Sequence, residues 1–149
     1  MAIDFLKEIV FASNNAAESK MIAYKESKGA IRRIAPRLYT TNMMDTPEAI
    51  VRRNLIAILG WRLPGCVISH KSASSLRPSD AGNLYVTYKF TRRIDDFPGL
   101  VLNVMKGPEH LESDIRLGSA EVYASSQERH KGTVQEIRSS YLLNWWKER

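Results

Sequence analysis

The sequence predicts an α+β protein whose first part holds short helices around one basic hairpin and whose second part is rich in β-strands. Two patterns favour this class: apolar residues recur at helical spacing in the first part and alternate at strand spacing between residues 84 and 90. Of the 149 residues, 44% are hydrophobic and 26% are charged, as in ordinary folded proteins and unlike disordered chains. We expect two parts, residues 1–64 and residues 65–149, which the length allows to pack as one unit.

The composition excludes several classes of protein. The single cysteine, Cys66, excludes a disulfide scaffold and a cysteine-rich zinc module. The apolar runs are too short to span a bilayer. The N-terminal segment MAIDFLKEIVF carries Asp4 and Glu8, where a signal peptide requires a basic start and an unbroken apolar core. We therefore expect a cytoplasmic protein that makes no membrane contact.

Two short helices are predicted at the start of the chain. The first, over residues 3–11, rests on apolar side chains at helical spacing, namely Ile3, Phe5, Leu6, Ile9 and Val10. A polar break follows, and Asn15 with Glu18 has the spacing of a capping box that opens a second helix over about residues 16–27. Gly29 is suited to end this helix, because glycine readily adopts the left-handed conformation found after a helix.

A small hairpin and a longer helix are predicted next. Residues 30–34 and 37–41 are short β-prone runs separated by Ala35-Pro36, which predicts a hairpin with proline at its turn or edge. Thr46 before Pro47 is a typical helix start. The helix over about residues 46–62 rests on apolar residues that repeat every 3.6 positions, namely Ile50, Val51, Leu55, Ile58 and Leu59.

The second part reads mainly as strands. Residues 66–68 form a short apolar run, after which Ser69 is predicted to cap a short helix. Asp95-Asp96 is read as part of a solvated turn region. Further strands are predicted over residues 84–90, 100–105 and 119–124, and a terminal helix from about residue 133.

Positive charge is concentrated in residues 20–37. The formal net charge of the chain is +6, and this window contributes +5 through six basic residues against Glu26. Such a window favours a bound polyanion, because the polyanion releases condensed counterions on binding. Two helices followed by a two-stranded wing is also the element order of a winged helix-turn-helix, in which the second helix enters the major groove. The pattern predicts DNA binding; a solvated basic face without a partner is the alternative.

The predicted DNA contacts lie on the second helix and in the wing. We expect the lysines to contact phosphates, and a serine and a tyrosine to lie near base edges or backbone. The wing arginines alternate in direction, so only some of them can face DNA. The residues assigned to DNA binding are Ser19, Lys20, Tyr24, Lys25, Lys28, Arg32, Arg33 and Arg37.

Three stretches resemble the abortive-infection AbiEi-type antitoxins. KGAIRRIAPRLYT at residues 28–40 is similar to the helix end and wing of that family, and VISHKSA at residues 67–73 to its S-H-x-S-A signature. EVYASSQER at residues 121–129 resembles the strand and loop before the family's C-terminal helices. Residues 7–14 and 45–53 are close to a related module that precedes Fic-type AMP-transferase domains.

The resemblance covers about residues 3–129 and implies a function. It implies a bacterial DNA-binding antitoxin that represses its own toxin–antitoxin operon, with double-stranded operator DNA and a cognate toxin as partners. Arg37 stands where the family usually has glycine, so we expect the wing turn to avoid a positive φ there. The Fic catalytic signature is absent, which excludes AMP transfer by that mechanism. The sequence beyond Arg129 departs from the family.

Two other functions remain open. The first is a protein-interaction module, without DNA binding, that neutralises a toxin or derives from the N-terminal part of a Fic-type protein. The second is a hydrolase or nuclease that uses Ser69 and His70, or the acids between Asp95 and Asp114. We disfavour catalysis because adjacent side chains rarely point at each other and no third orienting group is recognisable. No catalytic residue is therefore assigned.

No metal or cofactor is predicted. His110, Glu112 and Asp114 lie in an irregular loop with mixed ligand types, which does not favour a metal. Cys66 reads as a small buried hydrophobe. In the Trp145-Trp146 pair the first residue is expected to seal the core. The second is then exposed or contacts a cognate toxin or a second copy of the chain, as in a homodimer.

Overall fold

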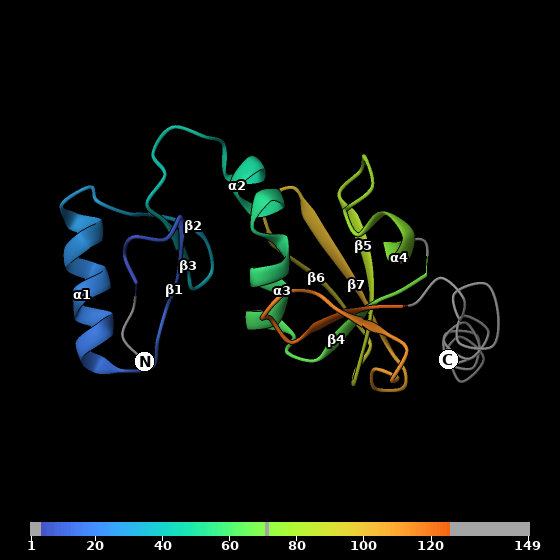
Figure 1. Ribbon diagram of the computed structural model, residues 1–149. Coiled ribbons are helices and arrows are strands. Elements are labelled where there is room, and N and C mark those ends of the chain that lie inside the picture. The colour runs from blue at the N-terminus through green and yellow to red at the C-terminus, as the bar shows by residue number, and fades with distance from the viewer. Residues whose placement is uncertain (1–3, 71, 126–149) are drawn as a thin grey trace. The chain divides into compact units, whose positions relative to one another are not determined.

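The computed structural model describes residues 4–70 and 72–125. Helices and strands are mixed along the chain, which confirms the coarse class that the sequence predicts (Figure 1). The predicted terminal helix and the Trp145-Trp146 pair lie outside the described residues. The elements in chain order are β1 (Ile9–Phe11), α1 (Ala16–Ser27), β2 (Arg32–Ala35), β3 (Leu38–Thr40), α2 (Pro47–Arg53), α3 (Leu55–Arg62), β4 (Cys66–Ile68), α4 (Ser72–Ser75), β5 (Asn83–Tyr88), β6 (Arg92–Phe97), β7 (Leu100–Lys106), β8 (Ile115–Arg116) and β9 (Val122–Ala124).

The chain forms two compact units. The first consists of Met1–Asn54 together with Asp96–Gly99, and the second of Leu55–Asp95 together with Leu100–Arg149. The sequence placed the boundary slightly later, between residues 64 and 65. Each unit has its own sheet, apart from the residues of β6 that fall in the first unit.

The first unit is built on an antiparallel sheet in the order β1-β3-β2, with α1 between β1 and β2 in sequence. The predicted second helix is confirmed: Asn15 Oδ1 accepts hydrogen bonds from the amides of Ala17 and Glu18 at 2.9 and 3.2 Å. Gly29 ends this region with a φ of +74°, as its position predicted. The predicted hairpin is also confirmed, as β2 and β3.

The predicted helix over residues 3–11 is wrong. Residues 9–11 are the strand β1, and Val10 pairs with Tyr39 of β3. Three apolar residues in a row fit a strand as well as a helix, and the partner strand lies far along the chain, where local periodicity cannot detect it. One helix, α1, therefore precedes the hairpin within the described residues. A winged helix-turn-helix with two helices before the wing is not present there.

The expected conformation of Arg37 is also wrong, because its φ is +61°. Ala35 pairs with Leu38, so Pro36 and Arg37 form a two-residue turn. A turn with proline first commonly requires a left-handed second residue, as in type II turns. The strained residue is anchored: Ala12 N donates to Arg37 O at 2.9 Å, and Arg37 Nη2 donates to Asn14 Oδ1 at 3.0 Å.

We expect the stability of the hairpin to depend on how easily the residue at position 37 adopts a positive φ. Arg37→Val should lower the free energy of unfolding by about 1–2 kcal/mol, because a β-branched side chain is strained at positive φ. Arg37→Gly should leave it unchanged or raise it, since relief of strain offsets the lost contact with Asn14. Urea unfolding of the three proteins measures the order. A valine variant as stable as the glycine variant would contradict it.

The helix predicted over residues 46–62 is confirmed at both ends but broken in the middle. Thr46 Oγ1 accepts from Ala49 N at 3.3 Å and caps α2, while Gly65 follows α3 with a φ of +89°. Asn54 separates the two helices. Its side-chain amide donates to Ile50 O at 2.9 Å and so competes with the backbone, as asparagine often does.

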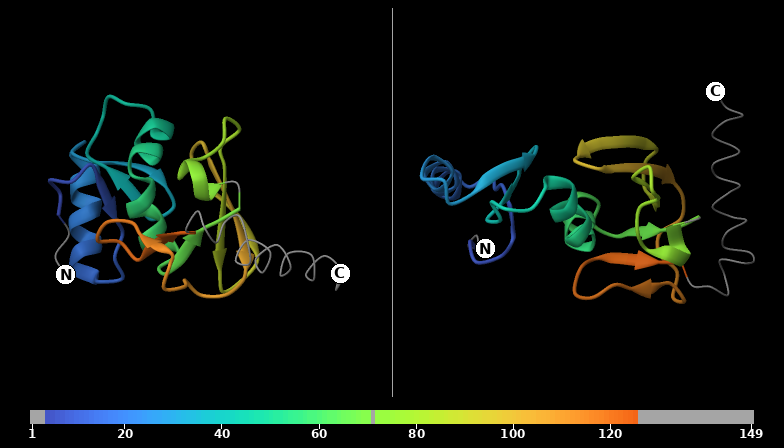
Figure 2. Two further views of the ribbon diagram at one scale, coloured as in Figure 1. Left: turned by 45° about the vertical axis from the view of Figure 1, so that its right-hand side comes forward. Right: turned by 90° about the horizontal axis from the view of Figure 1, so that it is seen from above.

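In the described part of the chain, the second unit is built on a six-stranded sheet in the order β6-β7-β5-β4-β9-β8 (Figure 2). β5 runs parallel to β7 and β4 parallel to β9, while β4 and β5 are antiparallel. Leu84 and Val86 on β5 and Leu102 on β7 are fully buried and contribute to its core. The reading of Asp95-Asp96 as a turn region is wrong, because both residues belong to β6. The strand escaped detection because it exposes four charged residues and buries two apolar ones.

Candidate nucleic-acid interface

Three of the predicted DNA-contacting residues form a stripe along one side of α1. Lys20, Tyr24 and Lys28 are spaced four residues apart, a spacing that places side chains on the same helix face, and all three are exposed. Ile22, two positions after Lys20, points to the opposite side and is 4% exposed. The helix thus anchors itself through one side and leaves the other to solvent. We call Lys20, Tyr24 and Lys28 the α1 stripe.

The acidic residues of α1 lie away from the α1 stripe. Glu18 precedes Lys20 by two residues and Glu26 precedes Lys28 by two residues, which rotates each carboxylate by about 200° around the helix. At the C-terminal end, Lys28 Nζ lies 5.7 Å from the centre of the Tyr24 ring, within cation–π range. The face that the stripe presents therefore carries positive charge and one aromatic ring.

The three wing arginines play different parts in the structure. Arg32 donates to the backbone carbonyl oxygens of Asn42, at 3.0 Å, and Asp45, and so holds the loop after β3. Arg37 holds Asn14, as described above. Arg33 is exposed on β2, opposite Tyr39 of β3, and makes one long hydrogen bond of 3.4 Å to Ala35 O. Arg33 is therefore the wing arginine most available to a phosphate.

The remaining two residues predicted to contact DNA make contacts within the first unit. Ser19 Oγ donates to Ser13 O at 3.1 Å, next to the helix start. Lys25 is half-buried, and its Nζ lies 5.5 Å from the centre of the Phe5 ring. The structure thus groups Lys20, Tyr24 and Lys28 on one face and gives Ser19 and Lys25 local structural contacts.

The Ser69-His70 pair corrects one argument drawn from the sequence. The two side chains do point at each other: Ser69 Oγ lies 2.9 Å from His70 Nδ1, helped by a φ of +57° at His70. Ser69 Oγ also lies 2.7 Å from Thr87 Oγ1, and Ser69 is completely buried. Ser69 contacts the start of α4 with its carbonyl oxygen, which accepts a hydrogen bond from Ser72 N, and not with its hydroxyl as a capping residue would. The hydroxyl is thus placed where a substrate in solution cannot reach it.

Cys66 is a poorly reactive thiol, and the acids of the second unit form no metal cluster in the described part of the chain. Burial raises the pKa of the Cys66 thiol to about 12, so the thiolate nucleophile is scarce at neutral pH. Among residues 4–70 and 72–125, no three His, Cys, Asp or Glu side chains gather closely enough to hold a metal ion. No helix in those ranges has the length and apolar character needed to cross a bilayer.

Comparison with known proteins leaves the family open. No family model, curated protein or solved structure matches the chain. The resemblance to AbiEi-type antitoxins therefore stays a prediction from the sequence.

A cluster of polar side chains that the sequence did not reveal stabilises the first unit. Arg53 Nε donates to Glu8 Oε1 at 2.9 Å, and Arg53 Nη2 donates to Glu8 Oε2 and to Asp45 Oδ2 at 2.6 and 2.8 Å. Asn42 Nδ2 donates to Glu8 Oε2 at 2.9 Å, and Asn54 Nδ2 to Glu8 Oε1 at 2.6 Å. The cluster ties the residue before β1 to the loop after β3 and to the end of α2. It also places one guanidinium against two carboxylates of the unit that carries the α1 stripe.

These contacts shift the acid–base equilibria of the cluster. Hydrogen bonds from Arg53, then from Asn42 and Asn54, lower the pKa of Glu8 from 4.5 to about 2. The Arg53 and Asn42 hydrogen bonds also lower the pKa of Asp45. Each carboxylate is therefore held in its charged form.

Acid should weaken the first unit through Glu8. Because the folded pKa lies below the unfolded value, the stabilisation is complete above about pH 4.5 and is lost as the pH falls toward 2. Solvent reaches this carboxylate, so we expect a loss of about 1 kcal/mol rather than the full linkage value. Urea unfolding at several pH values, for wild type and Glu8→Gln, measures it. The two curves should converge in acid; a constant difference would contradict the role of Glu8.

Proposed function

We propose that the protein is a DNA-binding, antitoxin-type transcriptional regulator and that its first unit contacts the duplex. The α1 stripe carries the proposal. It is an exposed helix face with two lysines and a tyrosine, and the acidic residues of the same helix point elsewhere. Lysines of this kind bind phosphates and release counterions, and tyrosine can donate a hydrogen bond to backbone or base.

The geometry supports a binding mode in which α1 acts as a recognition helix. A major groove about 12 Å wide admits one α-helix. The hairpin β2–β3 follows α1 directly and offers Arg33, so it would contact the backbone as a wing does. In this proposal the strand β1 takes the place of the first helix of a winged helix-turn-helix.

The operon and the toxin enter the proposal through the sequence resemblance. That resemblance supports operator DNA as the specific ligand and a cognate toxin as the protein partner. The proposal assigns no catalytic role to Ser69 and His70, since the serine hydroxyl is buried.

Mapping the contact surface by NMR tests this function. Amide spectra recorded during titration with duplex DNA from upstream of the gene should shift mainly at α1 and at the β2–β3 hairpin. Residues of β5 and β7 in the second unit serve as an internal control. Shifts confined to the second unit, or none at low salt, would overturn the proposal.

A further inference from the structure

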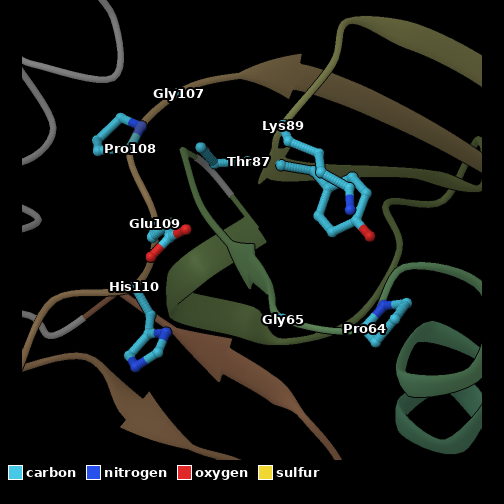
Figure 3. A pocket seen from close by; sticks show the side chains of 9 residues that line it. Pro64, Gly65, Thr87, Lys89, Gly107, Pro108, Glu109 and His110 are labelled. Atoms are coloured by element: carbon cyan, nitrogen blue, oxygen red, sulfur yellow. The ribbon is translucent and has the colours of Figure 1, made fainter.

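The second unit contains a partly open pocket of about 240 Å³ (Figure 3). Drug-sized ligands commonly occupy pockets of roughly 300–1,000 Å³, so a ligand of that size would fill this pocket and extend through its open side. Figure 3 shows Pro108, Glu109 and His110 following one another along one side, with Lys89 and Pro64 across from them. The lining is completed by Gly65, Thr87, Tyr88 and Gly107.

The wall beneath the pocket is fixed by tight packing between the ends of β5 and β7. Gly107 N donates to Tyr88 O at 3.0 Å. A Cβ on Gly107 would lie 2.6 Å from Thr87 Cγ2, so only glycine fits without movement. Thr87 is 2% exposed, and its hydroxyl is bonded to Ser69. The ends of β5 and β7 are therefore fixed at this side of the pocket, while Pro108, Glu109 and His110 belong to the segment that follows β7.

One side of the pocket offers a flat ring. The His110 imidazole stacks on Tyr123 with a centroid distance of 3.8 Å and an interplanar angle of 2°. Tyr123 does not line the pocket, whereas His110 does. The ring is thus supported from behind and can act as a platform for a planar ligand ring, as aromatic side chains do for bases.

Positively and negatively charged side chains lie on different sides of the pocket. Lys89 lines it on the side across from Glu109, and its Nζ lies 5.3 Å from the Tyr88 ring centre. Lys106 is exposed at the end of β7, where its amide donates to Thr91 Oγ1 at 3.0 Å, and Arg92 follows Thr91 directly. Cations thus gather at this end of the sheet, while Glu109 supplies an acceptor near the platform.

We propose that this pocket binds a free nucleoside monophosphate whose base carries an amino group, such as cytidine monophosphate. The base would stack on His110, and its amino group would donate to the Glu109 carboxylate, which can only accept when ionised. The phosphate would lie toward Lys89, with Lys106 and Arg92 adding to the local positive potential. The inference concerns a different unit from the α1 stripe and stands without DNA binding.

Calorimetric titration of the full chain with cytidine monophosphate tests the proposal. We expect saturable binding with one site per chain. His110→Ala and Lys89→Ala should each weaken it roughly tenfold, the first by loss of stacking and the second by loss of charge. Arg77→Ala removes an exposed cation elsewhere in the same unit and should leave the affinity unchanged. Thermal unfolding of each variant verifies that it is folded.

Matched ligands separate the contribution of the amino group from that of the phosphate. Uridine monophosphate replaces the amino group by a carbonyl and should bind roughly fivefold more weakly, a difference that Glu109→Gln should remove. Cytidine without phosphate should be insensitive to Lys89→Ala. The proposal is overturned if cytidine monophosphate does not bind at millimolar concentration, if folded His110→Ala and Lys89→Ala variants bind as wild type does, or if only single-stranded oligonucleotides bind.

Discussion

Replacing Lys20 and Lys28 together by glutamate should lower affinity for duplex DNA by at least roughly a hundredfold at low salt. In the proposed binding mode the change removes two phosphate contacts and places two carboxylates against the phosphate backbone. Lys20 is exposed on the side of α1 opposite Ile22, Lys28 is the exposed residue that directly follows the helix, and glutamate is a good helix former. The fold should therefore persist. Fluorescence anisotropy with labelled duplex measures the affinity.

A control variant with the same net charge distinguishes the loss of direct contacts from the loss of overall positive charge. Lys7→Glu with Arg77→Glu gives the same formal charge, but both residues are exposed outside the α1 stripe. Because long-range attraction is screened by salt, this pair should lower affinity far less than the stripe variant. Equal losses from the two double variants would show that the stripe is not the contact surface.

Gly107→Ala should destabilise the second unit by about 1–3 kcal/mol, the usual cost of overpacking. The added methyl would meet Thr87 Cγ2 at 2.6 Å, and Thr87 cannot easily move because it is buried and bonded to Ser69. Chemical denaturation of wild type and variant measures the loss in the free energy of unfolding.

Thr87→Ser provides the matched test of this steric explanation. Serine keeps the hydroxyl for Ser69 and removes the methyl that the new Cβ would strike. Gly107→Ala should therefore cost clearly less in the Thr87→Ser background than in wild type, a coupling that a double-mutant cycle reports. Additive effects of the two substitutions would refute the clash.

Local signals predicted the elements that depend on neighbouring residues. Asn15 and Gly29 marked the ends of α1, and Thr46 marked the start of α2, because caps act through backbone groups a few positions away. The β-rich second part was also predicted, since β5 alternates buried and exposed residues along most of its length.

Elements that depend on distant partners were missed. Strand β1 exists because Val10 pairs with Tyr39, and helical spacing of its apolar residues gave no indication of that. The break at Asn54 follows from an amide that bonds Ile50 and Glu8, one of them far away in sequence. Arg37 is left-handed because the turn requires it, in spite of its residue type.

The candidate site could be predicted in composition but not in detail. The charge window covers α1 and the hairpin, but it does not single out Lys20, Tyr24 and Lys28, which the structure leaves exposed at a spacing of four residues. The window could not show that Arg32 is tied to the carbonyls of Asn42 and Asp45. Nor could it find the Glu8–Arg53 cluster, whose members are separated by most of the first unit.

The salt dependence of DNA affinity tests the central claim most directly. For each phosphate neutralised, the logarithm of the affinity should fall with the logarithm of salt concentration with a slope of about −0.9. We predict a steep linear fall for wild type and a slope smaller by about one for Lys28→Ala, with Lys7→Ala unchanged. Absence of binding at low salt, or identical slopes for wild type and Lys28→Ala, would contradict DNA binding through the α1 stripe.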